Sequence, residues 1–225
     1  MNLPQKPEKF QPYIYTNQDM QRLIDAADSR HRYVWFLEPH TVRTLLLLLY
    51  GTGLRIDEAL RLNLGDFDLA GGVLAVRETK FFKSRLVPVG SDLQRVLRDY
   101  IDQQWPTERR TGTTPLLGTQ RYERIKRQTA ELVFKRLRQE AGVSRSSTAN
   151  FQPRLHDFRH TFAVMRLVTW YREGKNVQRL LPHLTTYLGH WRIMETQRYL
   201  TMTTELLEQA SICFERYARP EVPHA

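Results

Sequence analysis

The sequence predicts a mainly helical α+β domain that carries one small antiparallel sheet. Apolar residues recur at helical spacing through most of the 225 residues. Two short β-type runs, Val73–Val76 and Leu86–Val89, flank a basic segment and favour a β-hairpin. The chain shows no internal repeat or low-complexity tract, and its length is enough to bury one large core. One mostly helical domain is therefore expected.

Prolines and capping residues divide the chain further. Residues 1–15 hold three prolines and little periodicity, so we expect a lead-in or linker there and the domain in residues 16–225. The first helix is expected to start near Thr16 or Asn17, because the apolar residues that follow share one face. Further helices are expected at about 39–50, 55–62, 91–104, 123–141, 156–173, 176–188 and 204–218.

The composition favours a polyanionic partner. Lys and Arg number 34 against 24 Asp and Glu, so the net charge is +10 at pH 7. This charge suits DNA, RNA or an anionic membrane surface, and composition does not choose among them. The single cysteine, Cys213, excludes an internal disulfide and a Cys-rich zinc site. The longest apolar run, Leu45–Tyr50, is too short to span a bilayer, and with no signal pattern we expect a soluble cytoplasmic protein.

A first candidate for chemistry is the segment 52–58, in which a glycine turn leads into a helix. Arg55 lies in the first turn and Glu58 three residues later, so both share one face. An arginine held by its own glutamate presents a fixed guanidinium that suits phosphate oxygens. The alternative is an ordinary surface ion pair at a helix start.

A second candidate is the segment 156–163, where His156 shares a helical face with both Arg159 and His160. Three cationic or hydrogen-bonding groups within five residues rarely serve packing alone. One alternative is a His-x-x-x-His zinc pair with Asp157 as the base, which the neighbouring arginine disfavours. Another is a polar helix start with Asp157 near the positive end of the helix dipole.

A third candidate is the segment 188–199, in which a helix ends at Gly189, His190 follows, and Tyr199 comes nine residues later. Taken alone, Tyr199 is as well explained by packing in the core. Tyr171, Tyr187 and Tyr217 are equally plausible nucleophiles in isolation.

The basic hairpin tip is a fourth candidate. Lys80 precedes the tip, and Lys83 and Arg85 follow it. These residues either contact a DNA backbone or place a lysine in a groove as a proton donor. The nearby carboxylates Asp66 and Asp68 are typical of a turn and a cap, although two carboxylates also occur in two-metal nucleases.

Taken together and in this order, the four segments resemble the tyrosine recombinase (phage integrase) family over roughly residues 14–218. Each motif alone is weak to moderate, and four in order are a strong signal. Two features depart from the family. The family usually has a separate helical core-binding domain before the catalytic domain, whereas fewer than twenty residues precede the match here. The segment 177–187 is also longer than usual, and in this it is similar to the recombinases of mobile elements. The matching stretches are Thr52-Gly53-Leu54-Arg55 with Glu58, Thr79-Lys80 to Val89, Leu155 to Ala163, and Leu188-Gly189-His190 with Tyr199.

The resemblance implies a site-specific DNA recombinase that cuts and rejoins DNA through a 3′-phosphotyrosine link, with Tyr199 as nucleophile. It implies that Arg55 and Arg159 clamp the phosphate, and that His156 accepts the phenol proton or bonds a phosphate oxygen. His190 would donate a hydrogen bond to the same phosphate. No metal, ATP or other cofactor is needed, because the covalent link stores the bond energy.

The remaining roles follow from the same resemblance. Lys80 would protonate the leaving 5′ oxygen, with Lys83 as the alternative acid, and Lys83 and Arg85 would contact DNA. Glu58 would orient Arg55 or a histidine, and His160 would support Arg159 from behind by a hydrogen bond.

At the level of assembly, the resemblance implies a homo-tetramer on two DNA duplexes, associated with the nucleoid and assisted in some systems by accessory DNA-binding factors. The expected helix 204–218 would either pack on its own domain or dock on a neighbouring protomer. Two other functions remain open: a DNA-binding regulator without turnover, and a type IB topoisomerase-like nicking-closing enzyme.

Overall fold

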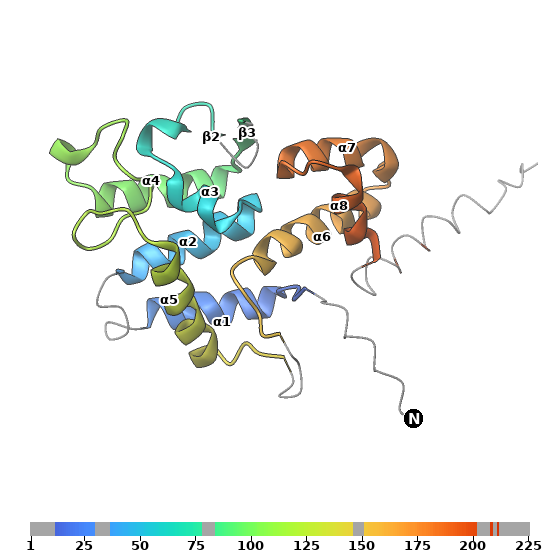
Figure 1. The fold of residues 1–225 in the computed structure, drawn as a ribbon, viewed down its shortest axis with the longest axis horizontal. Coiled ribbons are helices and arrows are strands. Elements are labelled where there is room, and N and C mark those ends of the chain that lie inside the picture. The colour runs from blue at the N-terminus through green and yellow to red at the C-terminus, as the bar shows by residue number, and fades with distance from the viewer. Residues whose placement is uncertain are drawn as a thin grey trace, which may run out of the picture.

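The computed structural model describes residues 12–29, 37–77, 84–145 and 151–201, together with residues 208 and 211, and these form a mostly helical domain with one small sheet (Figure 1). The fold class predicted from the sequence is thus confirmed. The α-helices are α1 (Asn17–Asp28), α2 (Pro39–Thr52), α3 (Ile56–Arg61), α4 (Ser91–Gln104), α5 (Arg127–Glu140), α6 (Asp157–Arg172), α7 (Val177–Leu188) and α8 (Ile193–Gln197). The 3₁₀-helices are η1 (Leu64–Asp66), η2 (Thr107–Arg109) and η3 (Arg198–Thr201), and the strands are β1 (Phe67–Asp68), β2 (Val73–Val76) and β3 (Arg85–Pro88).

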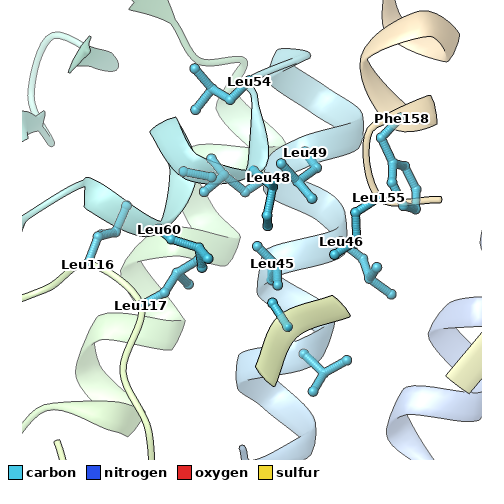
Figure 2. Close-up of a cluster of buried hydrophobic side chains, with 14 of the residues drawn as sticks. Leu45, Leu46, Leu48, Leu49, Leu54, Leu60, Leu116, Leu117, Leu155 and Phe158 are labelled. Atoms are coloured by element: carbon cyan, nitrogen blue, oxygen red, sulfur yellow. The ribbon is translucent and has the colours of Figure 1, made fainter. Parts of the chain in front are cut away.

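Helix α2 is the central element of the core. Five of its fourteen residues are leucine, and it packs against α1, α4 and α6. Figure 2 shows Leu45, Leu46, Leu48 and Leu49 of α2 among the buried side chains that surround it, with Phe158 of α6 on one side. A helix that is apolar nearly all round must be covered on several faces, and that is the position α2 takes.

Helix α1 starts where its capping residues predict. The Thr16 hydroxyl accepts a hydrogen bond from the backbone of Asp19, whose carboxylate accepts one in return from the Thr16 backbone, so two free amide groups are satisfied. Just before this cap, Tyr15 is buried and its ring stacks on Phe158 at 4.3 Å between centroids. The end of the predicted lead-in segment therefore packs on α6.

The three strands form an antiparallel sheet in the order β1-β2-β3. In its register Val73 lies opposite Pro88 and Val76 lies opposite Arg85. Strand β2 has the predicted bounds, and β3 begins one residue before the predicted start. The sheet brings Arg85, the first residue of β3, toward the end of α7, which β3 contacts.

The predicted bounds fail mainly at α5, which was expected from residue 123 and begins at Arg127. Residues 119–123 instead form a hydrogen-bonded turn in which Tyr122 has a positive φ of 63°. An L residue in that conformation cannot continue a right-handed helix, so the helix starts after the turn. The predicted helix 204–218 lies outside the described residues apart from two isolated positions.

A second apolar cluster holds the C-terminal elements together. It comprises buried residues of α6, α7 and η3, among them Leu167, Leu181, Leu188 and Tyr199. Figure 1 shows α7 and α8 on the side of α6 that faces away from α5. Among the described helices, none is long and apolar enough to cross a membrane.

Candidate active site

The site begins at the turn between α2 and α3. Helix α2 ends at Gly53, whose φ of +63° is left-handed, and a Cβ at this position would lie 2.6 Å from Cδ1 of Phe162. This close approach lets the chain reverse directly against α6. Arg55 then takes the N-cap position of α3, with extended backbone angles, and Glu58 lies at the third helical residue.

Glu58 is the buried anion around which the site is organised. It accepts hydrogen bonds from the backbone nitrogen of Arg55 at 2.9 Å and from its Nη1, also at 2.9 Å. It also accepts bonds from Nη1 and Nη2 of Arg85, at 3.0 and 2.8 Å. Burial alone would raise the pKa of Glu58, but the hydrogen bonds and charge of Arg85, the backbone hydrogen bond from Arg55 and the charge of Arg159 lower it to about 2. The carboxylate therefore stays charged at neutral pH.

Arg85, which the sequence predicts to contact DNA, has a side chain that faces the protein interior. Its side chain is only 11% exposed, two of its nitrogens bond Glu58, and its Nε donates to the backbone oxygen of Tyr187 at 2.7 Å. Three of its five N–H groups thus donate to protein acceptors. Arg85 ties β3 to α3 and to the end of α7.

Three consecutive backbone oxygens at the C-terminal end of α7 accept hydrogen bonds from three arginine side chains. Arg85 donates to Tyr187, Arg159 donates to Leu188, and Arg55 donates through Nη2 to Gly189 at 3.2 Å. The last carbonyls of a helix lack partners within the helix and carry the negative end of its dipole. The guanidinium groups satisfy these carbonyls and are in turn held by them.

Arg159 is almost fully buried, with 2% of its surface exposed. Besides the bond to Leu188, its Nη1 donates to the backbone oxygen of Gly53 at 3.0 Å. Burial and the neighbouring charge of Arg55 lower the pKa of Arg159 to about 10, so it remains charged at neutral pH. The two predicted clamp residues thus act on one another electrostatically, and both are anchored to backbone rather than free to move.

The two histidines of α6 lie side by side at the start of that helix. The rings of His156 and His160 meet edge to face at 5.0 Å between centroids. His156 is exposed, whereas Nδ1 of His160 is buried and has no hydrogen-bond partner among the described residues. Burial, followed by the charges of His156 and Arg159, lowers the pKa of His160 to about 3. The expected hydrogen bond from His160 to the back of Arg159 is therefore not present at Nδ1, and the ring lies against Tyr199 instead, at 5.5 Å.

His190 follows the left-handed Gly189 that ends α7. Its Nδ1 lies 2.8 Å from the hydroxyl of Thr196, and its ring is nearly parallel to that of Tyr199 at 6.0 Å. Burial, then the charges of Arg159 and Arg55, lower the pKa of His190 to about 3. The ring is thus neutral at neutral pH and carries one proton on one of its two nitrogens.

Tyr199 is the tyrosine that the fold brings to these groups. It is 3% exposed, lies on η3, and contacts the rings of both His160 and His190. Burial raises the pKa of its phenol, while the charge of Arg159 and a hydrogen bond from the same guanidinium lower it. The competing candidate Tyr187 stacks on Phe162 in the second apolar cluster, with its pKa raised by burial to about 12.

A groove of about 790 Å³ opens beside this cluster, between α3, α5 and the segment that leads into α6. Arg55 and His156 line it at the end next to the site. Its other walls combine cations with an apolar floor: Arg127, Lys135, Arg138, Arg154, Ile56, Phe134, Phe151, Pro153 and Leu155, with the acids Asp57 and Glu131 and the amide Gln152. A groove next to the site with five Arg or Lys side chains against two acids suits a polyanion.

Other predicted residues fall in two groups. Lys80 and Lys83 lie outside the described residues. Asp66 and Asp68 have the turn and cap contacts predicted for them: Asp66 accepts from the backbone of Asn63, and Asp68 accepts from two backbone amides in the turn before β2. In the part of the chain that the structure describes, no group of three or more His, Cys, Asp or Glu side chains is arranged to hold a metal ion.

The comparisons with known proteins bear on this constellation. The model of the phage integrase family matches residues 14–205. The chain belongs to the phage integrase family. It is 41% identical over 217 residues to y4rB of Sinorhizobium fredii, which is provisionally named an integrase/recombinase. It is also 34% identical over 166 residues to the tyrosine recombinase XerC of Pelobacter propionicus. The predicted enzyme class, a tyrosine-type site-specific recombinase, is thus confirmed from its relatives.

Solved structures of this phage integrase family have the same fold. The XerA recombinase structure superposes with a TM-score of 0.70 at 23% identity, over 97% of this chain and 68% of that one. The Tn1549 transposon integrase, solved in complex with transposon right end DNA, gives a TM-score of 0.67 at 19% identity, over 96% of this chain and 69% of that one. The alignment with y4rB covers 95% of this chain and 69% of y4rB. The alignment with XerC covers 73% of this chain and 49% of XerC.

Proposed function

We propose that this integrase-family chain cuts and rejoins DNA strands, with Tyr199 as the nucleophile. The observation that carries the proposal is the meeting of one tyrosine with Arg159, His160 and His190 at the point where Arg55 is anchored. Residues from α3, α6, α7 and η3 converge there, although Arg55 and Tyr199 are far apart in the sequence. Ordinary core packing does not require a buried guanidinium group, Arg159, and a second, partly exposed one, Arg55, close to a phenol.

In the proposed reaction the phenol oxygen of Tyr199 attacks the scissile phosphorus and the bond to the 5′ oxygen breaks. Arg55 and Arg159 bind the non-bridging oxygens, where negative charge grows in the transition state, and each such donor contributes on the order of 10²–10³ in rate. His156, which is exposed and whose pKa is lowered mainly by desolvation, accepts the phenol proton or bonds a phosphate oxygen. Lys80 supplies the proton to the leaving oxygen.

The reverse attack by a 5′ hydroxyl of another strand rejoins the DNA and restores the phenol. The phosphoryl group moves from oxygen to tyrosine and back, so the number of ester bonds is conserved and no nucleotide is hydrolysed. In full recombination four copies of the chain act on two duplexes, and the segment 204–218 links neighbouring copies.

The test uses a pool of nicked duplexes of randomised sequence in EDTA, from which a covalent protein–DNA adduct is separated on a denaturing gel. We expect adduct with the native chain and none with Tyr199→Phe. The matched control is Tyr187→Phe, which removes a hydroxyl from a partly buried tyrosine packed against the same cluster and should leave adduct formation intact. Adduct formation by Tyr199→Phe at the native rate would refute the proposal.

Two further outcomes separate the alternative functions. Adduct with relaxation of supercoiled DNA, but no recombinant product from two duplexes carrying the recovered sequence, would indicate a topoisomerase-like enzyme. Specific DNA binding without adduct under any condition would indicate a regulator.

We also propose that the groove beside the site holds the DNA backbone. When binding neutralises phosphates, the logarithm of the DNA-binding constant falls linearly with the logarithm of the salt concentration. Each lost phosphate contact makes the slope of that line shallower by about one. Lys135→Ala, in the groove, should reduce the slope. Lys175→Ala is the control, because Lys175 lies beyond the opposite end of α6 in an exposed pair with Glu173. An equal slope for both variants would remove the groove from the proposed interface.

A further inference from the structure

The environment of His190 fixes more than the position of its ring. A neutral imidazole has one nitrogen that donates and one that accepts, so its use as a donor depends on which nitrogen carries the proton. Nδ1 of His190 faces the hydroxyl of Thr196 at 2.8 Å, which leaves Nε2 as the nitrogen available to the site. Whether Nε2 carries a proton is therefore decided by what Thr196 does at Nδ1.

Thr196 belongs to a short chain of hydroxyl groups behind His190. The Thr185 hydroxyl lies 3.0 Å from the hydroxyl of Thr196 and 2.9 Å from the backbone oxygen of Leu181, and its single proton can go to either one. Thr196 has no exposed surface. When Thr185 gives its proton to Thr196, the proton of Thr196 has Nδ1 of His190 as its acceptor, and the ring carries its own proton on Nε2. When Thr185 donates to Leu181 instead, Thr196 donates to Thr185 and Nδ1 donates to Thr196, which leaves Nε2 without a proton to offer a phosphate.

We propose that Thr196, backed by Thr185, is a positioning residue that donates to Nδ1 of His190 and so keeps the proton on Nε2, where it can bond a phosphate oxygen. This inference rests on the proposed function, because the phosphate is the acceptor that it supplies. It assigns a role to a residue outside the sequence motifs. It also explains why a buried threonine is present on α8, a helix whose other residues are all exposed.

The charges around the ring keep it neutral, so that it carries a single proton. Arg159, Arg55, Arg85 and the ring of His160 all disfavour a charged His190, in addition to burial, so the free site holds the neutral ring. A ring that already carries its proton on Nε2 can donate to an arriving phosphate without first gaining a proton. A ring with its proton on Nδ1 would present a lone pair to the negative phosphate and repel it.

The direct test is the tautomer itself. The native full chain, labelled with ¹⁵N-histidine, is examined by NMR at pH 7, and the His190 signal is assigned from its loss in His190→Gln. We expect the shifts of a neutral ring protonated on Nε2. A ring protonated on Nδ1 would overturn the proposal, and it corresponds to the competing arrangement in which Thr185 donates only to Leu181 and Nδ1 donates to Thr196.

The kinetic test compares Thr196→Val with Thr196→Ser. Valine has nearly the shape of threonine without the hydroxyl, whereas serine keeps the hydroxyl and loses a methyl group. We expect adduct formation to slow by at least about tenfold in Thr196→Val with unchanged DNA affinity, and Thr196→Ser to recover most of the native rate. Equal losses in both variants would indicate a packing role only and overturn the proposal, as would a native rate in Thr196→Val.

The two tests separate this inference from the proposed function. If the native chain forms no adduct, the proposed function fails, and the NMR spectrum still decides the tautomer of His190. If the native chain forms adduct and the spectrum shows the proton on Nδ1, the proposed function stands and only the role of Thr196 fails. Thermal unfolding of both variants confirms that each one is folded before rates are compared.

Discussion

Replacing Glu58 with glutamine should destabilise the protein strongly, although the two side chains have nearly the same shape. The carboxylate accepts four hydrogen bonds from Arg55 and Arg85 and is 8% exposed. The pKa of Glu58 is about 2, against an ordinary value of 4.5. At 1.36 kcal/mol for each pKa unit, this difference corresponds to about 3 kcal/mol of stability at neutral pH. The same order of loss is expected when one partner of a buried ion pair is removed.

The assay is urea unfolding at pH 7, with Glu131→Gln as the matched control. Glu131 also pairs with an arginine, Arg127, but both side chains are about half exposed, so its loss should cost less than about 1 kcal/mol. Because the pKa of Glu58 is depressed, its contribution is complete above pH 4.5 and is lost as the pH falls toward 2. The gap between the native chain and Glu58→Gln should therefore narrow at pH 3. Equal losses in the two glutamine variants, or a gap that does not change with pH, would refute this reasoning.

Three other predictions follow from the same contacts. Arg159→Lys should slow adduct formation by about a hundredfold or more, because one ammonium group cannot hold two separate carbonyls and a phosphate; near-native single-turnover cleavage would contradict the clamp. Gly53→Ala should lower the free energy of urea unfolding by more than Gly174→Ala. Both glycines have positive φ, a conformation that costs alanine about 1–2 kcal/mol. Only at Gly53 would the new Cβ also clash with a neighbouring side chain. Equal losses of unfolding free energy in the two variants would show that the clash is relieved. His160 and His190 have pKa values of about 3 in the folded protein, against an ordinary value of 6.5, so both rings stay neutral when folded. As the pH falls below 6.5, the free energy of unfolding should therefore decrease by up to about 1.4 kcal/mol per pH unit for each histidine. An unfolding free energy that does not change from pH 7 to pH 4 would contradict the burial of these rings.

The sequence was most informative where local rules decide the structure. The start of α1 at Asn17, the strand Val73–Val76 and the helix Ser91–Gln104 all lie where the sequence pattern placed them. The start of α5 was placed too early because nothing local revealed that Tyr122 takes a left-handed conformation. That conformation depends on a turn closed by Thr119, which apolar periodicity does not detect.

The position of Arg85 was within reach of the sequence but was missed. Side chains alternate across a strand, so Arg85 shares a face with Val87, and Val87 is fully buried. That pattern predicts an inward arginine, which then needs a buried anion, and Glu58 was already identified. The basic character of the neighbouring hairpin favoured the interpretation that Arg85 contacts DNA.

Other parts of the site depend on tertiary structure and have no local signal. The order of the motifs identified Arg55, Arg159 and Tyr199 as a set, but not the backbone oxygens that hold the arginines. The partnership of Thr196 with His190 is equally hidden, because it depends on how α8 turns back against the end of α7. Residue types at fixed spacing indicate which groups are present, whereas their supports come from the fold.

The end of α7 explains how the site can remain positive and still be stable. Three guanidinium groups converge there, and Glu58 supplies one full negative charge among them. The remaining repulsion is reduced by backbone carbonyls at a helix terminus that carries roughly half a negative charge. Dipoles can orient these cations without neutralising them, so the site keeps the charge that an arriving phosphate requires. Because the same three residues, 187–189, hold Arg55, Arg85 and Arg159 and lead directly into His190, displacement of α7 would disturb all of these groups together. The phosphate-binding groups are therefore expected to assemble or fail as one unit rather than residue by residue.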